Sequence, residues 1–85
     1  MRIEVLYFAV LRERVRCDGE SLDLPAGARV REARAAIAAR RPEIAPLLPR
    51  VRAAVNRTVV GDDHSLGDGD ELAFLPPVSG GAATV

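Results

Sequence analysis

One stretch in the middle of the chain has helical periodicity, and short alternating stretches lie on both sides of it. Val30, Ala33 and Ile37 share one face of the expected helix, and the charged residues lie off that face: Arg31, Glu32, Arg34 and Arg40. Pro42 marks its end, because proline has no amide hydrogen to donate. The buried face is rich in alanine, including Ala33 and Ala36, so this helix can lie close to a sheet.

The stretches around this helix have the composition and alternation of β-strands. Strands are predicted at residues 2–9, 21–24, 51–56, 58–60 and 71–75. Both the odd-numbered and the even-numbered positions of residues 2–9 carry apolar side chains, which favours an interior strand. Short helical pieces are expected at residues 11–15 and 44–48. The order of strand, strand, helix, strands and strand predicts an α+β fold of the β-grasp type, with one main helix packed on one face of a mixed sheet.

The length of the chain bounds what it can do alone. Its 85 residues allow one domain with a modest core, so an elaborate active site would have to come from a partner. We predict a β-grasp domain over residues 1–77 and a flexible C-terminal tail over residues 78–85, which contains Gly80-Gly81. Pro76-Pro77 removes two backbone donors and should end the last strand. These features favour a carrier or binding module over a self-contained enzyme.

The charge pattern and the cysteine and histidine content argue against several classes of partner. The 12 basic and 12 acidic residues balance, so we expect neither nucleic acid nor a membrane as a partner. All basic residues are arginine, which leaves no lysine to receive an isopeptide bond. Cys17 is the only cysteine, His64 has no second histidine beside it, and no signal or membrane-spanning segment is evident. We therefore expect no metal site, no disulfide and a cytoplasmic location.

Alternation also predicts which residues of the first and last strands face the helix. The inward set is Ile3, Val5, Tyr7, Leu72 and Phe74. The outward set is Leu6, Phe8, Ala73 and Leu75. The outward set forms an apolar patch beside the tail and is a candidate partner surface, unless loops of the chain cover it.

The C-terminal third of the chain carries a more specific pattern. Asp68-Gly69-Asp70-Glu71 precedes an apolar strand, and Pro76-Pro77 and Gly80-Gly81 follow it. At this spacing the chain resembles the small subunits of molybdopterin synthase, which are ubiquitin-like sulfur carriers. The resemblance extends to Val5–Ala9 and Leu11-Arg12-Glu13, and it covers residues 2–81. It implies a ubiquitin-like β-grasp fold.

The resemblance also implies a sequence of chemical steps at the C-terminal glycine. A ubiquitin-activating-type adenylyltransferase would use ATP to adenylate the Gly81 carboxylate, and a sulfur-donor enzyme would convert the adenylate to a thiocarboxylate. The carrier would then give its sulfur to a pterin precursor on the synthase large subunit, in a heterotetramer that makes the molybdenum cofactor. The chain would be a non-catalytic sulfur-donor subunit without a bound cofactor of its own.

Several residues before Gly81 have implied roles in this scheme. Gly80 and Gly81 have no side chains to block a narrow partner tunnel. Pro76-Pro77 would stiffen the base of the tail. Pro76, Pro77, Val78 and Ser79 would join the apolar patch in the partner interface.

The chain continues past Gly81 through Ala82-Ala83-Thr84-Val85, which places the Gly81 carboxyl group in a peptide bond. We expect a processing protease to remove these four residues, although a cloning remnant or a copy that carries no sulfur would give the same sequence. Other functions also remain open. The sulfur could go to thiazole, a thiolated tRNA base or cysteine, the chain could be a ubiquitin-like protein modifier, or it could be an interaction domain with an inert tail.

Overall fold

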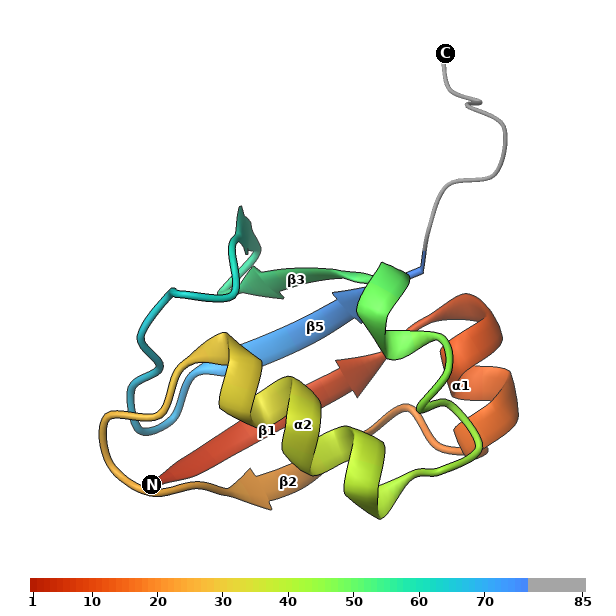
Figure 1. Cartoon of the computed structure of the whole chain (residues 1–85), viewed down its shortest axis with the longest axis horizontal. Coiled ribbons are helices and arrows are strands. Elements are labelled where there is room, and N and C mark those ends of the chain that lie inside the picture. Colours follow the sequence, from red (N-terminus) through yellow and green to blue (C-terminus); the bar gives the residue numbers. More distant parts are fainter. Residues whose placement is uncertain (77–85) are drawn as a thin grey trace, which may run out of the picture.

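Five strands form one mixed sheet in the computed structural model, which describes residues 1–76 (Figure 1). Their order across the sheet is β2-β1-β5-β3-β4. The strands are β1 (Arg2–Tyr7), β2 (Gly19–Asp23), β3 (Arg52–Val55), β4 (Thr58–Val60) and β5 (Glu71–Leu75). β1 and β5 pair in parallel, and the other neighbours pair antiparallel. β1 is therefore an interior strand, as its apolar residues at both parities predicted.

The main helix, α2 (Val30–Arg40), lies across one face of this sheet (Figure 1). Its buried residues are Val30, Ala33 and Ile37, which are the residues that the helical spacing predicted. A shorter helix, α1 (Ala9–Val15), connects β1 to β2, and a 3₁₀ helix, η1 (Leu48–Arg50), precedes β3. This arrangement confirms the predicted ubiquitin-like β-grasp fold.

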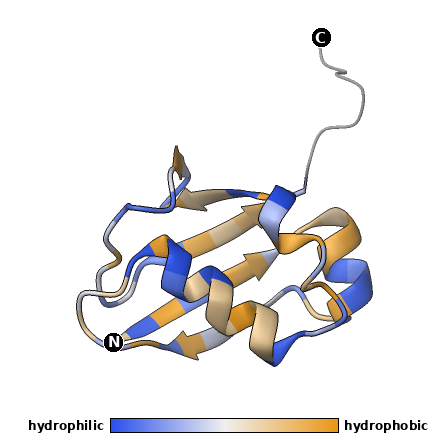
Figure 2. Cartoon of the chain, viewed as in Figure 1, coloured by the Kyte–Doolittle hydropathy of each residue, from blue (hydrophilic) through white to orange (hydrophobic). Residues whose placement is uncertain are grey.

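The core lies between the sheet and α2. All five residues predicted to face the helix are buried, with at most 1% of their surface exposed. Burying a large apolar side chain stabilises a fold by roughly 1.5–3 kcal/mol, so this layer supplies much of the stability of the domain. Figure 2 shows hydrophobic residues along the central strands and hydrophilic residues in the loop between β4 and β5.

Some boundaries differ from the sequence-based expectation. β1 ends at Tyr7 instead of residue 9, because Phe8 caps α1 and Ala9 turns the backbone with a φ of 50°. α1 has seven residues, whereas a single turn was predicted. Residues 42–47 form turns, and the helical piece expected at residues 44–48 appears as η1, which begins at Leu48.

A polar cluster joins the buried side of the sheet to the end of α2. The Tyr7 hydroxyl donates to the Glu20 carboxylate, and Arg41 donates to Glu20 through Nε at 2.9 Å and through Nη2 at 3.2 Å. Burial alone would raise the pKa of Glu20, but the hydrogen bonds from Arg41 and Tyr7 outweigh it and the pKa is lowered. Burial, and then the bond to Glu20, raises the pKa of Tyr7. Glu20 therefore stays ionised and holds β1, β2 and the end of α2 together.

The predicted boundary between the β-grasp domain and the tail, after residue 77, lies outside the residues that the structure describes. Pro77, the last residue of the predicted domain, and the predicted tail at residues 78–85 lie outside the described residues. Within residues 1–76, neither α1 nor α2 reaches the length and hydrophobicity that crossing a membrane requires.

Candidate partner-binding face

The face of the sheet opposite α2 carries a row of apolar side chains that crosses four strands. The pairing of β1 with β5 places Leu6 next to Ala73, and the pairing of β5 with β3 places Ala73 next to Ala54. β4 then adds Val59 beside Ala54. We call this surface the open face.

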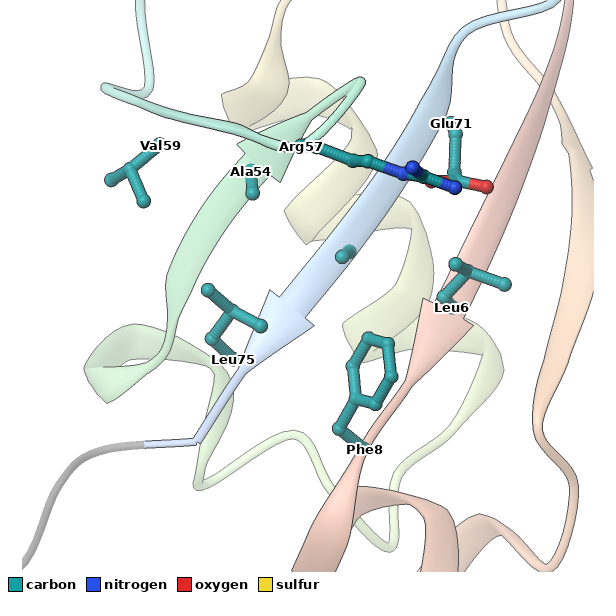
Figure 3. Close-up of a pocket in the computed structure, with 8 residues that line it drawn as sticks. Leu6, Phe8, Ala54, Arg57, Val59, Glu71 and Leu75 are labelled. Atoms are coloured by element: carbon teal, nitrogen blue, oxygen red, sulfur yellow. The ribbon is translucent and has the colours of Figure 1, made fainter.

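Phe8 and Leu75 extend the open face toward the end of β5 (Figure 3). Phe8 is 41% exposed, and Leu6, Ala73 and Leu75 are half-buried, so the loops of residues 1–76 leave this face open. The four residues that alternation placed outside the core thus lie together on one surface. They line a depression of about 340 Å³.

Four further residues line the depression: Ala54, Arg57, Val59 and Glu71. Sequence reasoning did not assign these residues to the surface. Ala54 and Val59 belong to it because of the register between β3, β4 and β5, which joins segments distant in the sequence. The alternation within residues 51–56 could have identified Ala54, since it places Ala54 on the opposite face of the strand from Ala53 and Val55.

The polar edge of the depression is formed by Arg57 and Glu71. Arg57 lies in the turn between β3 and β4, where it has a φ of 72° and follows Asn56 with a φ of 49°. From this turn its side chain extends across β5 and points toward Glu71 (Figure 3). Glu71 is also the register partner of Glu4 on β1, so two carboxylates occupy neighbouring positions at this edge.

The two carboxylates have different surroundings. Glu4 accepts a hydrogen bond from Ser21 Oγ at 3.0 Å and lies 3.8 Å from Arg2 Nε. Among the ion pairs of residues 1–76, none includes Glu71 or Arg57. These two residues therefore place opposite charges at the same edge of the depression.

The predicted tail residues lie beyond this surface in the chain. Pro76 follows Leu75 directly and is half-buried. Pro77, Val78, Ser79, Gly80 and Gly81 lie outside the described residues. Their assigned roles stay predictions.

His64 and Cys17 belong to no common site in the described part of the chain. His64 is exposed in the loop before β5, and Cys17 is half-buried before β2. Across residues 1–76, no three His, Cys, Asp or Glu side chains are grouped so that they could hold a metal ion.

Comparison with known proteins gives consistent matches along most of the chain. Residues 5–81 match the model of the ThiS family. The molybdopterin synthase sulfur carrier subunit of Escherichia coli is 44% identical over 81 residues, which is 93% of this chain and 99% of that protein. The subunit of the same name from Chlamydomonas reinhardtii is 37% identical, over 95% of this chain and 100% of that protein.

Solved structures agree with these matches. A putative molybdopterin converting factor subunit 1 from Pyrococcus furiosus has a TM-score of 0.80 at 32% identity, over 92% of this chain and 99% of that chain. A chain in the complex of subunits 1 and 2 of the Helicobacter pylori molybdopterin-converting factor has a TM-score of 0.70 at 26% identity, over 95% of this chain and 100% of that chain. The small archaeal modifier protein 1 of Haloferax volcanii has a TM-score of 0.84 at 26% identity, over 95% and 100%.

Proposed function

Because this chain belongs to the ThiS family, we propose that it is the sulfur-carrier subunit of a molybdopterin synthase. The observation that carries this proposal is the similarity to sulfur carrier subunits over nearly the full length of both chains. The family match also extends through Gly80 and Gly81, where the carrier chemistry would occur.

The carrier chemistry requires activation of a carboxylate. An oxygen of the free Gly81 carboxylate attacks the α-phosphorus of ATP on an adenylyltransferase, and pyrophosphate leaves. A persulfide sulfur of a donor enzyme then attacks the acyl carbon, and AMP leaves. Reductive cleavage of the remaining sulfur–sulfur bond by a thiol leaves the thiocarboxylate, which is the nucleophile toward the pterin precursor on the large subunit.

The chain contributes a docking surface and a terminus to this reaction, and its partners supply the catalytic groups and the ATP. The proposed interface combines the open face with Pro76, Pro77, Val78 and Ser79. The complex of subunits 1 and 2 from Helicobacter pylori supports a large subunit as a partner. We propose a heterotetramer of two carriers and two large subunits, and a cytoplasmic location.

The proposal requires a free carboxyl group at Gly81. In the given sequence a peptide bond links Gly81 to Ala82, so cleavage after Gly81 has to precede adenylation. A processing protease of the host is the proposed agent.

The direct test is the intact mass of the protein from its own host, measured before and after incubation with its adenylyltransferase, ATP and a sulfur donor. We expect a species that ends at Gly81 and then gains the mass difference of sulfur for oxygen. A variant without Gly80 and Gly81 is the matched control and should keep its mass. A wild-type chain that stays full length and never gains sulfur would contradict the proposal.

A second candidate function is protein modification, which the similarity to the small archaeal modifier protein 1 favours. A modifier joins its terminal glycine to lysine amines of other proteins by amide bonds. It therefore predicts conjugates of higher mass that resist thiol reagents. The same mass experiment distinguishes the two functions, since a thiocarboxylate carrier gives no such conjugates.

A further inference from the structure

The side chains of this protein contain no primary amine, because all 12 basic residues are arginine. Lysine can lose its proton and act as a nucleophile, whereas the guanidinium group of arginine stays protonated in proteins. The chain therefore keeps positive charges for its ion pairs, such as Arg34 with Asp62 at 2.8 Å, without an amine that could attack an acyl group.

An activated Gly81 is a target for amines. In the proposed function this residue passes through an acyl-adenylate, and the nitrogen of a neutral amine can attack its acyl carbon. A carbon–nitrogen bond forms, the bond to the phosphate oxygen breaks, AMP leaves, and the nitrogen loses a proton to solvent. The amide no longer reacts with sulfur, so the carrier is lost. A thioester with Cys17, the one thiol of the chain, would still react with sulfur.

The α-amino group of Met1 is the remaining primary amine of the given sequence. It donates a hydrogen bond to the backbone carbonyl of Leu24 at 2.7 Å, and the backbone N–H of Leu24 donates to the Met1 carbonyl at 2.9 Å. These bonds continue the pairing of β1 with β2 by one residue beyond Arg2 and Asp23. Met1 is half-buried and packs against the hydrophobic core. The amine is therefore held in the sheet.

The parallel pairing of β1 with β5 separates this amine from the tail of its own chain. Phe74 lies beside Tyr7, which follows Met1 by six residues, and six residues of strand span roughly 20 Å. β5 then continues away from Met1 to Pro76. The five residues from Pro76 to Gly81 span at most about 18 Å. Gly81 thus falls short of the amine at the other end of the sheet.

We propose that this chain is a donor only: once Gly81 is activated, no amine of its own chain or of a second copy takes the acyl group. The activated carrier then persists until an external nucleophile reacts, and carriers neither close into rings nor join into chains. This inference rests on the proposed function, because it concerns the activated glycine. It applies equally to a protein modifier, for which it predicts single attachments in place of chains of linked copies.

The test returns one lysine to the chain, either near the tail or far from it. Arg52 is exposed and pairs with Leu75 at the end of β5, so Arg52→Lys places an amine within reach of Gly81. Arg2→Lys is the matched control, because it adds the same amine to an exposed position at the start of β1.

Each chain is prepared with a thioester at Gly81 by thiol cleavage of an intein fusion, so that no adenylyltransferase is needed. Circular dichroism shows that the variants are folded. Amide products are then followed by intact mass and on denaturing gels after treatment with excess thiol. A ring has a mass one water below that of the free acid, and a linked dimer has about twice the mass of one chain.

We expect the wild type only to hydrolyse and Arg52→Lys to form the ring. A short tether gives an effective concentration of about 1 mM, so the ring should form at least roughly tenfold faster than any amide product of Arg2→Lys in a dilute solution. Wild-type chains that form rings or linked dimers as fast as Arg52→Lys would overturn the proposal. An Arg52→Lys chain that forms no amide would also overturn it, because the lack of lysine would then protect nothing.

The proposed function fails separately from this inference. The thioester bypasses adenylation, so the rings and dimers report only on the amines of the chain. A wild-type chain that only hydrolyses here, but is never adenylated or loaded with sulfur in the mass experiment, would overturn the proposed function alone.

Discussion

Asn56 and Glu71 exchange two hydrogen bonds where the turn between β3 and β4 meets the start of β5. The backbone N–H of Asn56 donates to the backbone carbonyl of Glu71 at 2.8 Å, and the backbone N–H of Glu71 donates to the side-chain Oδ1 of Asn56 at 3.0 Å. Asn56 Nδ2 also donates to Asp70 Oδ1 at 3.0 Å. This one side chain therefore holds the turn that carries Arg57 against the first residues of β5.

Replacing Asn56 should destabilise the fold. Asn56→Ala removes two side-chain hydrogen bonds and places alanine at a φ of 49°, where asparagine is better tolerated. We expect the free energy of unfolding to fall by about 1–3 kcal/mol in urea titrations. Asn56→Gly loses the same bonds but adopts positive φ freely, so it should lose less. Wild-type stability in Asn56→Ala would show that these bonds contribute nothing.

Acid should weaken the fold through Asp70. The amide of Gly67, which donates at 2.7 Å, and then the Asn56 side chain lower the pKa of Asp70 below its ordinary value of 3.8. A lowered folded-state pKa means that this stabilisation is complete above the unfolded-state pKa and is lost as the pH falls through the folded-state value. The prediction is a decline in stability below about pH 4 that is shallower in Asp70→Asn.

Thermal unfolding of both proteins between about pH 2 and pH 6 measures this difference. Glu20→Gln is the useful comparison, because the pKa of Glu20 is also lowered and its loss should remove a separate part of the acid sensitivity. Identical pH profiles for Asp70→Asn and the wild type would exclude Asp70 as a contributor.

Gly19 should not tolerate a side chain. An added Cβ would clash with the carbonyl oxygen of Val5 and approach Leu6 Cδ2 to 3.1 Å. We expect Gly19→Ala to lower stability by about 1–3 kcal/mol and to displace Leu6 on the open face. Gly61→Ala is the matched control, because its Cβ would meet nothing within 4 Å. Differential scanning calorimetry of the pair tests this, and equal melting temperatures would contradict the clash.

Local pattern was sufficient to predict the layers of the fold. The inward residues of β1 and β5 follow from simple alternation, and the buried face of α2 follows from its spacing. The junction at Phe8 and Ala9 was missed, because apolar residues continue through it and nothing nearby indicates the positive φ at Ala9. A non-glycine residue adopts that conformation only where the surrounding structure requires it.

The candidate site was predictable only in part. Leu6 and Ala73 follow from the alternation of their own strands, but their position beside Ala54 depends on which strands pair and in which register. The direction of Arg57 depends on a turn with two left-handed residues, which a residue pattern alone does not define. Gly80 and Gly81 came from the sequence motif, and they stay a prediction that the mass experiment tests.

The central position of β5 has a mechanical consequence for a carrier whose terminus must enter a partner. β5 lies between β1 and β3, and the residues that lead to Gly81 follow it directly. Tension along those residues would load the backbone hydrogen bonds to both neighbours in shear, so that many must break together. At a sheet edge the same tension along the strand would load the hydrogen bonds to one neighbour only. The sheet is thus built to resist a pull on the end that does the chemistry.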